Sequence, residues 1–208
     1  MKLLIATNNQ HKIKEYQQIF ADIPFEVTTP RQEGLTLDPE ETGLSFAENA
    51  LIKAKAFAKA SGLLTLADDS GLEVDALNKA PGIYSARYGG TDKEAHQKRY
   101  QLVLEKLQAL NAPDEARTAR FKCAIAIVSP QGQAEVVEGT VEGQIASAPV
   151  GSNGFGYDPI FFLAEFGKTM AQLEDAEKHA ISHRGRAAQA AIPVLKQRVK
   201  AKGLSHIL

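Results

Sequence analysis

Two adjacent acidic residues, Asp68 and Asp69, are the side chains of this sequence best suited to bind a metal ion. They directly follow residues 63–67, an apolar run that predicts a buried strand. In open α/β sheets, ligands bind at the carboxyl ends of strands, and carboxylates are hard oxygen ligands that Mg²⁺ takes together with phosphates and water. Successive strand side chains point to opposite faces, so we expect only one of the two carboxylates to face a given site. An acidic turn ending at Gly71 is the simpler alternative.

Glu40 and Glu41 are further candidate metal ligands, because they lie in a predicted loop just before Thr42 and Gly43. Two neighbouring glutamates in a loop are usually solvated. Their positions alone do not decide which of them would reach a metal.

A candidate phosphate site is the run TNNQHK at residues 7–12, between an apolar run at residues 3–6 and a predicted helix. Such a turn presents free backbone N–H groups and the positive end of the helix dipole, which suit phosphate oxygens. Lys12 would add a point charge, while Thr7 and Asn8 would add neutral hydrogen bonds. An Asn-rich turn with an N-cap is the alternative, and the spacing is not that of a Walker A loop.

Residues 151–158 form a glycine-rich segment that ends in Asp158. Its three glycines let the backbone approach a ligand closely. Phe155 and Tyr157 offer flat rings, and stacking of a base on such a ring is typically worth ~1–3 kcal/mol. Asp158 or nearby backbone groups would read the base edge. The alternative is a glycine-rich turn whose rings belong to the core.

Residues 177–185 gather cations and hydrogen-bonding groups at the start of the last predicted helix. Arg184 presents a donor fork suited to phosphate or carbonyl oxygens, Lys178 is a point charge, and His183 can donate or accept near neutral pH. A solvated helix face is the alternative. Ser-His hydrolase chemistry is not expected, because the sequence lacks a G-x-S-x-G nucleophile elbow.

The elements that must position these residues alternate between strand and helix at first, whereas neighbouring strands follow one another in the middle. We therefore expect an α/β fold with a mixed sheet. S-x-x-E and T-x-x-E capping boxes at Ser45 and Thr91 predict two helix starts, the second box ending at Glu94, and Pro193 should kink or break the last helix. The expected strands are residues 3–6, 63–67 and 121–128, with one or two more within residues 134–147. The expected helices are residues 12–20, 45–60, 91–110 and most of 171–201.

Composition excludes several classes of protein. The 208 residues, 44% of them hydrophobic, fit one large globular domain or two tightly joined lobes. A net charge of −1 leaves no general basic field, so we expect a small ligand and no nucleic acid. No apolar run approaches the ~20 residues of a membrane span, which favours a cytoplasmic protein that does not enter a membrane. Cys123, the single cysteine, lies in an apolar run and is expected to be a buried small hydrophobe.

The order of these motifs resembles the inosine triphosphate pyrophosphatase family, the Ham1 or RdgB-like purine nucleotide pyrophosphatases. Asn8 is the one departure, because many members have glycine there, although others have asparagine. The matching segments cover nearly the whole chain: ATNNQHKIKE at 6–15, EETGLSFAENA at 40–50, ADDSGL at 67–72, PGIYSARY at 81–88, GFGYDP at 154–159 and EKHAISHR at 177–184.

The resemblance implies a single domain over residues 1–208, an elongated fold of two lobes around a long mixed sheet, with the nucleotide in the cleft between them. It implies a homodimer that uses Mg²⁺ to hydrolyse ITP, dITP and XTP to the monophosphate and pyrophosphate, which removes deaminated purines from the nucleotide pool. Glu40 and Asp69 would bind the metal, and Asp69 would also accept a proton from the attacking water. The implied substrate contacts are Thr7, Asn8, Asn9, Gln10, His11, Lys12, Ser70, Phe155, Gly156, Tyr157, Asp158, Lys178, His183 and Arg184.

Two other functions stay open. One is a similarly folded Maf-like pyrophosphatase that acts on modified pyrimidines or methylated nucleotides. The other is a nucleotide-binding module without turnover, against which the acidic pair and the lysines Lys12 and Lys178 argue.

Overall fold

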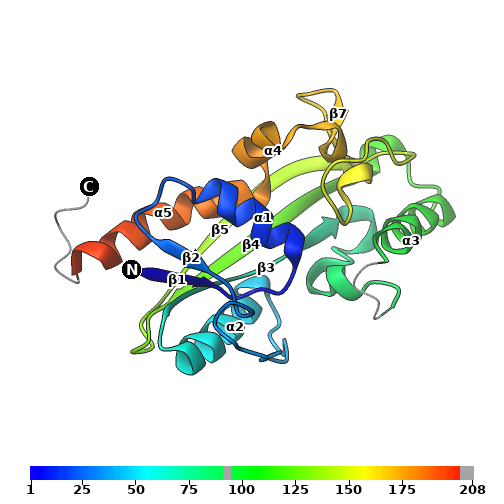
Figure 1. Ribbon diagram of the computed structural model, residues 1–208. Coiled ribbons are helices and arrows are strands. Elements are labelled where there is room, and N and C mark those ends of the chain that lie inside the picture. Colours follow the sequence, from blue (N-terminus) through cyan, green and yellow to red (C-terminus); the bar gives the residue numbers. More distant parts are fainter. Residues whose placement is uncertain (91–94, 202–208) are drawn as a thin grey trace. The chain divides into compact units, whose positions relative to one another are not determined.

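The computed structural model describes residues 1–90 and 95–201 of the chain (Figure 1). In this part of the chain one seven-stranded sheet has the order β2-β1-β3-β4-β5-β6-β7. The strands are β1 (Lys2–Ile5), β2 (Glu26–Thr28), β3 (Leu64–Val74), β4 (Thr118–Val128), β5 (Ala134–Ile145), β6 (Phe161–Leu163) and β7 (Lys168–Thr169). The α-helices are α1 (Gln10–Ile19), α2 (Phe46–Ser61), α3 (His96–Ala109), α4 (Asp175–Ile181) and α5 (His183–Ala201), and the short 3-10 helices include η1 (Asp75–Leu77) and η2 (Gly82–Arg87).

Both strand directions occur in the sheet. β1 pairs in parallel with β2 and with β3, as strands joined by helical connections do. β5 and β6 pair antiparallel, as do β6 and β7. The predicted α/β class with a mixed sheet is therefore confirmed.

The chain divides into two compact units. Of the described residues, unit 1 comprises those of Met1–Asp69, Cys123–Gly139 and 184–201, and unit 2 comprises those of Ser70–Lys122 and Thr140–His183. The strands β3, β4 and β5 each contribute residues to both units.

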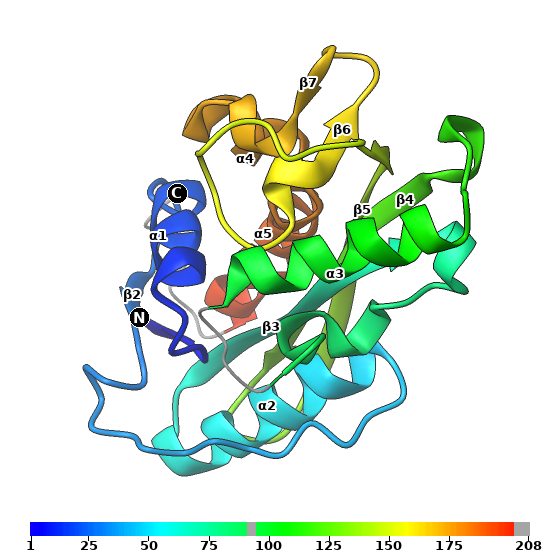
Figure 2. The ribbon, with the colours of Figure 1, turned by 90° about the vertical axis from the view of Figure 1, so that its right-hand side faces the viewer.

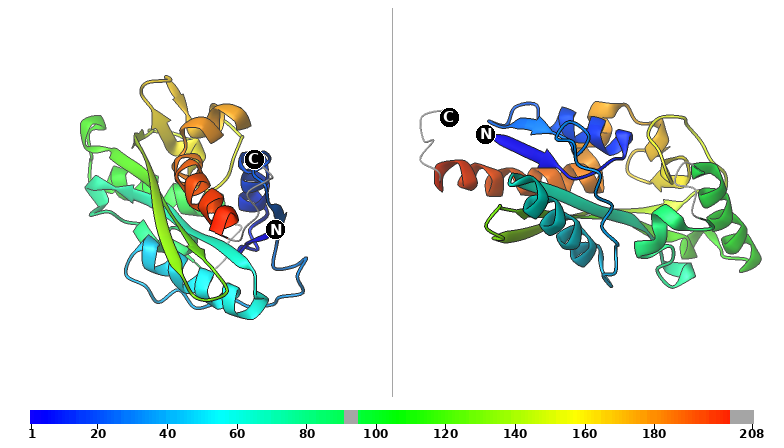
Figure 3. Two further views of the ribbon diagram at one scale, coloured as in Figure 1. Left: turned by 90° about the vertical axis from the view of Figure 1, so that its left-hand side faces the viewer. Right: turned by 60° about the horizontal axis from the view of Figure 1, so that its bottom comes forward.

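Unit 1 has its own hydrophobic core. Leu66 of β3 and Ile125 of β4 are fully buried against Tyr16 of α1 and Ala187 and Ala191 of α5. Alanines on α5 let this helix approach the strands closely. The helix α2 lies on the other side of the strands from α1 and α5 (Figure 3).

Unit 2 has a second core, to which strands and a helix contribute. Leu72 of β3, Phe121 of β4 and Phe161 of β6 pack with Val103 and Leu107 of α3. Phe121 and Phe161 lie with their ring centroids 4.3 Å apart. Of the helices that the structure describes, none has the length and hydrophobicity that a membrane crossing requires.

Local signals explain both ends of α2. The Ser45 hydroxyl accepts a hydrogen bond from the backbone N–H of Glu48, as the capping box predicts, and Gly62 ends α2 with φ +66°. The second predicted box, Thr91 and Glu94, lies outside the described residues, and α3 is seen from His96.

The C-terminal helical stretch differs from its prediction in one respect. Ser182 has an extended backbone and separates α4 from α5, whereas α5 runs through Pro193 to Ala201. A break at Pro193 was therefore the wrong expectation. The proline costs the helix one hydrogen bond, and buried Ala191, Leu195 and Val199 hold the helix on both sides of it.

Candidate active site

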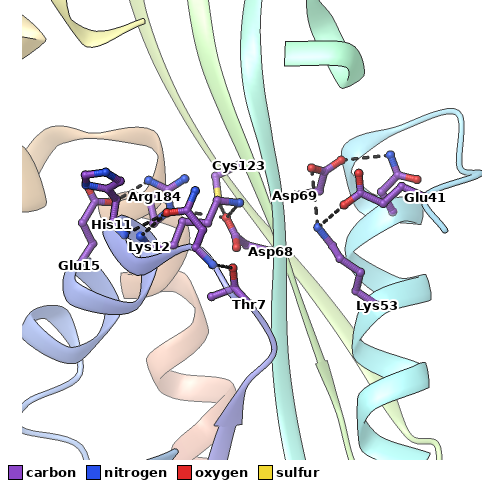
Figure 4. Close-up of polar contacts among 12 residues, drawn as sticks. Thr7, His11, Lys12, Glu15, Glu41, Lys53, Asp68, Asp69, Cys123 and Arg184 are labelled. Carbon is purple, nitrogen blue, oxygen red and sulfur yellow. Dashed lines mark hydrogen bonds and ion pairs between the residues drawn. The ribbon is translucent and has the colours of Figure 1, made fainter. Parts of the chain in front are cut away.

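Asp68 and Asp69 follow each other on β3 and point to opposite faces of the strand (Figure 4). Asp68 faces Lys12 of α1 and Arg184 of α5, whereas Asp69 faces Lys53 of α2. The two carboxylates thus belong to separate groups within unit 1, as the alternation of strand side chains predicts.

The Asp69 group contains a cation between two carboxylates. The Lys53 Nζ lies 2.7 Å from Glu41 Oε1 and 3.9 Å from Asp69 Oδ1. The Asn49 amide donates to Asp69 Oδ2 at 3.1 Å. Burial raises the pKa of Asp69 above its ordinary value; Lys53 opposes this shift and Glu41 adds to it. Burial would lower the pKa of Lys53, but its acidic neighbours raise it.

The loop before α2 is tied to the same asparagine. The Asn49 Oδ1 accepts the backbone N–H of Gly43 at 2.8 Å, so the amide bridges this loop and Asp69. Any Cβ at Gly43 would lie 2.6 Å from Glu48 Cβ and 2.7 Å from Asn49 Oδ1, so the close approach requires glycine. This turn places the half-buried Glu41 beside Lys53.

Two carboxylates make this group a candidate cation site. No set of three or more His, Cys, Asp or Glu side chains arranged to hold a metal occurs among the described residues. Mg²⁺ is often held by one or two carboxylates, with water and substrate phosphates as its other ligands, and Asp69 and Glu41 are a pair of this kind. Glu40, the predicted ligand, is exposed.

The Asp68 group is a buried network of alternating charges. The Asp68 Oδ2 lies 2.9 Å from Lys12 Nζ and 3.5 Å from Arg184 Nε, and Arg184 Nη1 donates to Glu15 Oε2 at 2.6 Å. Burial would raise the pKa of Asp68, but Lys12 and Arg184 together hold it well below its usual range. Lys12 and Arg184 thus offset the buried charges of Asp68 and Glu15.

Cys123 borders this network. Its Sγ lies 3.8 Å from Asp68 Oδ2, and burial raises the pKa of the thiol to about 12. The predicted role as a buried small hydrophobe fits this environment, because a thiol with that pKa is not a nucleophile at neutral pH.

The turn at residues 7–12 is built around an N-cap. The Asn9 Oδ1 accepts the backbone N–H groups of His11 at 2.9 Å and Lys12 at 3.2 Å, and Thr7 Oγ1 accepts that of Asn9. Two of the backbone N–H groups that were predicted to bind a phosphate therefore donate to the Asn9 side chain instead. Asn8, Gln10 and His11 are exposed.

In unit 2 the glycine-rich loop is organised by Asp158. The Asp158 Oδ2 accepts the backbone N–H of Phe155 at 2.9 Å and the Lys178 ammonium at 2.8 Å. The Lys178 Nζ also lies over the Phe155 ring, 5.1 Å from its centroid. Gly154 has φ +75°, and a Cβ there would overlap the Asp158 carboxylate. Three predicted residues, Phe155, Asp158 and Lys178, are thus brought together.

Other predicted residues of unit 2 have structural partners. Tyr157 is buried, and its hydroxyl donates to the Ser85 carbonyl at 2.7 Å, so its ring belongs to the core. His183 is buried and stacks on Phe121 with centroids 4.7 Å apart. Ser70 lies in β3 and is half-buried, as is Gly156 in the loop.

The sequence alone assigned no function to Asn49 and Lys53. They lie four residues apart on one face of α2, and this spacing was the available signal. An Ala-rich helix usually carries such residues on its solvated side. The structure shows that this face of α2 instead turns toward Asp69, which both residues contact.

Comparisons with known proteins agree with this architecture. The model of the Ham1 family matches residues 3–194. The dITP/XTP pyrophosphatase of Exiguobacterium sibiricum is 46% identical over 90% of this chain and 93% of its own, and that of Bacillus subtilis is 47% identical over 87% and 90%. The structure of a HAM1 protein from Coxiella burnetii has a TM-score of 0.85 at 42% identity and covers 95% of this chain and 99% of its own. The Ham1 protein of Staphylococcus aureus has a TM-score of 0.83 at 43% identity, covering 95% of this chain and 100% of its own. The chain belongs to the Ham1 family.

Proposed function

We propose that this chain hydrolyses purine nucleoside triphosphates with deaminated bases, dITP, ITP and XTP, to the monophosphate and pyrophosphate. Relatives of nearly the same length are dITP/XTP pyrophosphatases. The observation that carries the proposal is the half-buried Lys53 ammonium beside the Asp69 and Glu41 carboxylates, because it supports a site in which two acids surround one positive charge.

Asp69 and Glu41 would hold Mg²⁺, and we propose Glu41 in place of Glu40. The fit rests on their oxygen donors and on the contact that both acids make with Lys53. When bound, the metal would neutralise charge on the triphosphate, which is most of what phosphoanhydride cleavage requires.

Asp69 would act as proton acceptor for the attacking water. Its raised pKa makes it a better base than an ordinary aspartate. Asn49 donates to one carboxylate oxygen and thereby leaves the other directed toward Lys53. A fixed carboxylate can orient a water molecule as well as accept its proton.

The triphosphate would be bound by residues 7–12, and chiefly by Lys12. Asp68 holds the Lys12 ammonium in place at 2.9 Å, and Arg184 and Glu15 support Asp68 from behind. A prepositioned cation loses little side-chain entropy when a phosphate arrives. Arg184 would therefore contribute to phosphate binding indirectly, because it holds Asp68, which in turn holds Lys12.

For the base we propose stacking on Phe155, with Lys178 as a donor to the 6-oxo group. The ammonium is held over the ring by Asp158, and an ammonium can only donate hydrogen bonds. An oxo acceptor satisfies such a donor, whereas the amine of adenine opposes it, and mismatches of this kind can discriminate by ~10⁴-fold. Ser70, Gly156, Tyr157 and His183 remain proposed substrate contacts.

The experiment is pyrophosphate release from a panel of triphosphates, each with and without Mg²⁺. We expect release from dITP, ITP and XTP, little from dATP and dGTP, and none without the metal. A preference for methylated or pyrimidine nucleotides would instead support a Maf-like activity. Binding of dITP with no pyrophosphate formed would support a nucleotide-binding module.

A further inference from the structure

Arg99 of α3 is a buried cation of unit 2 that the proposed function does not use. The residue is 5% exposed. Its Nη1 donates to the Ala86 carbonyl at 3.1 Å, and its Nη2 lies 2.5 Å from Nδ1 of His96, one helical turn earlier. A buried guanidinium keeps its charge and therefore needs acceptors such as these.

The Arg99 contact fixes the state of His96. A guanidinium can only donate, so the Nδ1 of His96 must be the acceptor, and its proton must be on Nε2. The contact therefore restricts the rotation of the imidazole ring. The Ala86 carbonyl in turn anchors Arg99 to η2.

His96 reaches the proposed base platform. Its ring meets Phe155 with centroids 6.2 Å apart and an interplanar angle of 61°, which is an edge-to-face contact. Figure 2 shows the N-terminal end of α3 beside the glycine-rich loop that carries Phe155. The half-buried Phe155 ring is thus contacted by the His96 imidazole as well as by the Lys178 ammonium.

Both ends of this arrangement are tied to adjacent carbonyls of η2. Tyr157, two residues after Phe155, donates to the Ser85 carbonyl, and Arg99 donates to the next one, that of Ala86. The glycine-rich loop and α3 are therefore both hydrogen-bonded to η2. This arrangement fixes where His96 and Phe155 meet.

We propose that His96 and Arg99 are positioning residues that hold the Phe155 ring in its orientation for the purine base. Arg99 acts through His96, and His96 acts through the Phe155 ring. A ring that is already oriented loses less freedom on binding, so the pair raises affinity for the nucleotide without taking part in the chemistry. This inference rests on the proposed function, because Phe155 is the proposed stacking platform.

The test is the kinetics of dITP hydrolysis by variants of the whole chain. We expect His96→Ala to raise KM about three- to tenfold, the value of one edge-to-face pair, with kcat within about twofold. His96→Phe, which keeps an aromatic edge, should recover most of the loss, and Arg99→Met should raise KM in the same direction. Lys98→Ala, an exposed change on the same helix, is the matched control.

A double-mutant cycle separates positioning from general destabilisation. In a Phe155→Leu background the further change His96→Ala should leave KM within about twofold of the Phe155→Leu value. The reason is that this background lacks the Phe155 ring through which His96 acts. Should His96→Ala melt well below wild type, His96→Asn, which retains an acceptor for Arg99, replaces it. An unchanged KM in the single variants, or an equal effect with and without Phe155, would overturn the inference.

Failure of the proposed function gives a different result. In that case the unmodified protein itself releases no pyrophosphate from dITP. The same variants are then compared by calorimetric titration with dITP, in which a weaker affinity of His96→Ala still supports the positioning role and an unchanged affinity overturns it.

Discussion

Asp68 and Asp69 are neighbours on β3, yet their pKa values move in opposite directions. Burial favours protonation of both, but Lys12 and Arg184 outweigh it at Asp68, whereas at Asp69 burial outweighs the more distant lysines. Asp68 is thereby a fixed negative charge that anchors cations. Asp69 is the more basic of the two and is suited to accept a proton.

Lys53 should compete with the metal for Asp69 and Glu41. In Lys53→Met the two carboxylates lose the cation between them, so we expect a lower Tm in EDTA and Mg²⁺ affinity tighter by about tenfold, equivalent to 1.4 kcal/mol. Thermal melts across a Mg²⁺ titration measure both effects. An equal Mg²⁺-dependent rise of Tm in Lys53→Met and in Lys59→Met, an exposed lysine on the same helix, would contradict this assignment.

The buried network around Arg184 predicts a large stability effect. Arg184→Met leaves the buried Glu15 carboxylate without this donor and leaves Asp68 with Lys12 alone, which should lower the free energy of unfolding by about 3–5 kcal/mol. Arg198→Met, the same substitution on α5, removes a pair with the half-exposed Glu135 and should cost about 1 kcal/mol or less. Urea unfolding of both variants gives the comparison, and similar losses would be inconsistent with it.

Gly154 should be required for the unit 2 site. A methyl group there meets the Asp158 carboxylate and lies 2.9 Å from Lys178 Nζ, so Gly154→Ala should separate this pair and raise the KM for dITP. Gly167 has φ +60°, and a methyl group at that position would have no other atom within 4 Å, so Gly167→Ala carries the backbone strain without the overlap. Steady-state kinetics should show a KM increase of about tenfold or more only in Gly154→Ala. Equal kinetics in the two variants would show that the overlap is harmless.

Asp75 should make stability depend on pH in the acid range. Hydrogen bonds from Arg120, Lys79 and Thr118 hold the pKa of Asp75 below its ordinary value. A carboxyl whose pKa is lower in the folded state stabilises the protein above the unfolded-state value of about 3.9, and this contribution is lost as the pH falls below it. Asp75→Asn should therefore lose about 1 kcal/mol or less at pH 7 and show a flatter decline of stability between about pH 5 and 3. Parallel pH curves for the two proteins would refute it.

Much of the fold follows from local signals in the sequence. The alternation of strand and helix, the box at Ser45 and Glu48 and the apolar run before Asp68 are local patterns, so the longer strands and the start of α2 could be predicted. The short strands β2, β6 and β7 and the start of α5 were not predicted. The extension of α5 through Pro193 could not be predicted, because it depends on buried contacts of Leu195 and Val199 with the rest of unit 1.

The candidate site was less predictable where it depends on long-range partners. The contact of Glu41 with Lys53 joins the loop before α2 to the helix, and the pairing of Asp158 with Lys178 joins residues twenty apart. Arg184 was expected among the substrate contacts, but its buried partners Glu15 and Asp68 come from distant elements. Residue types and spacing indicate the chemistry; which groups meet is decided by tertiary packing.

Pyrophosphate release from dITP in the presence of Mg²⁺, compared between wild type and Asp69→Asn, tests most directly whether Asp69 is the reactive carboxylate. We expect Asp69→Asn to lose turnover by about 10²- to 10⁴-fold, while the affinity for dITP measured by calorimetry changes far less. The reason is that the proposed role of Asp69 is to accept a proton and help hold the metal, and it does not bind the base. Asp75→Asn, a matched change outside the site, should keep the wild-type rate. Turnover by Asp69→Asn close to that of wild type would contradict the account.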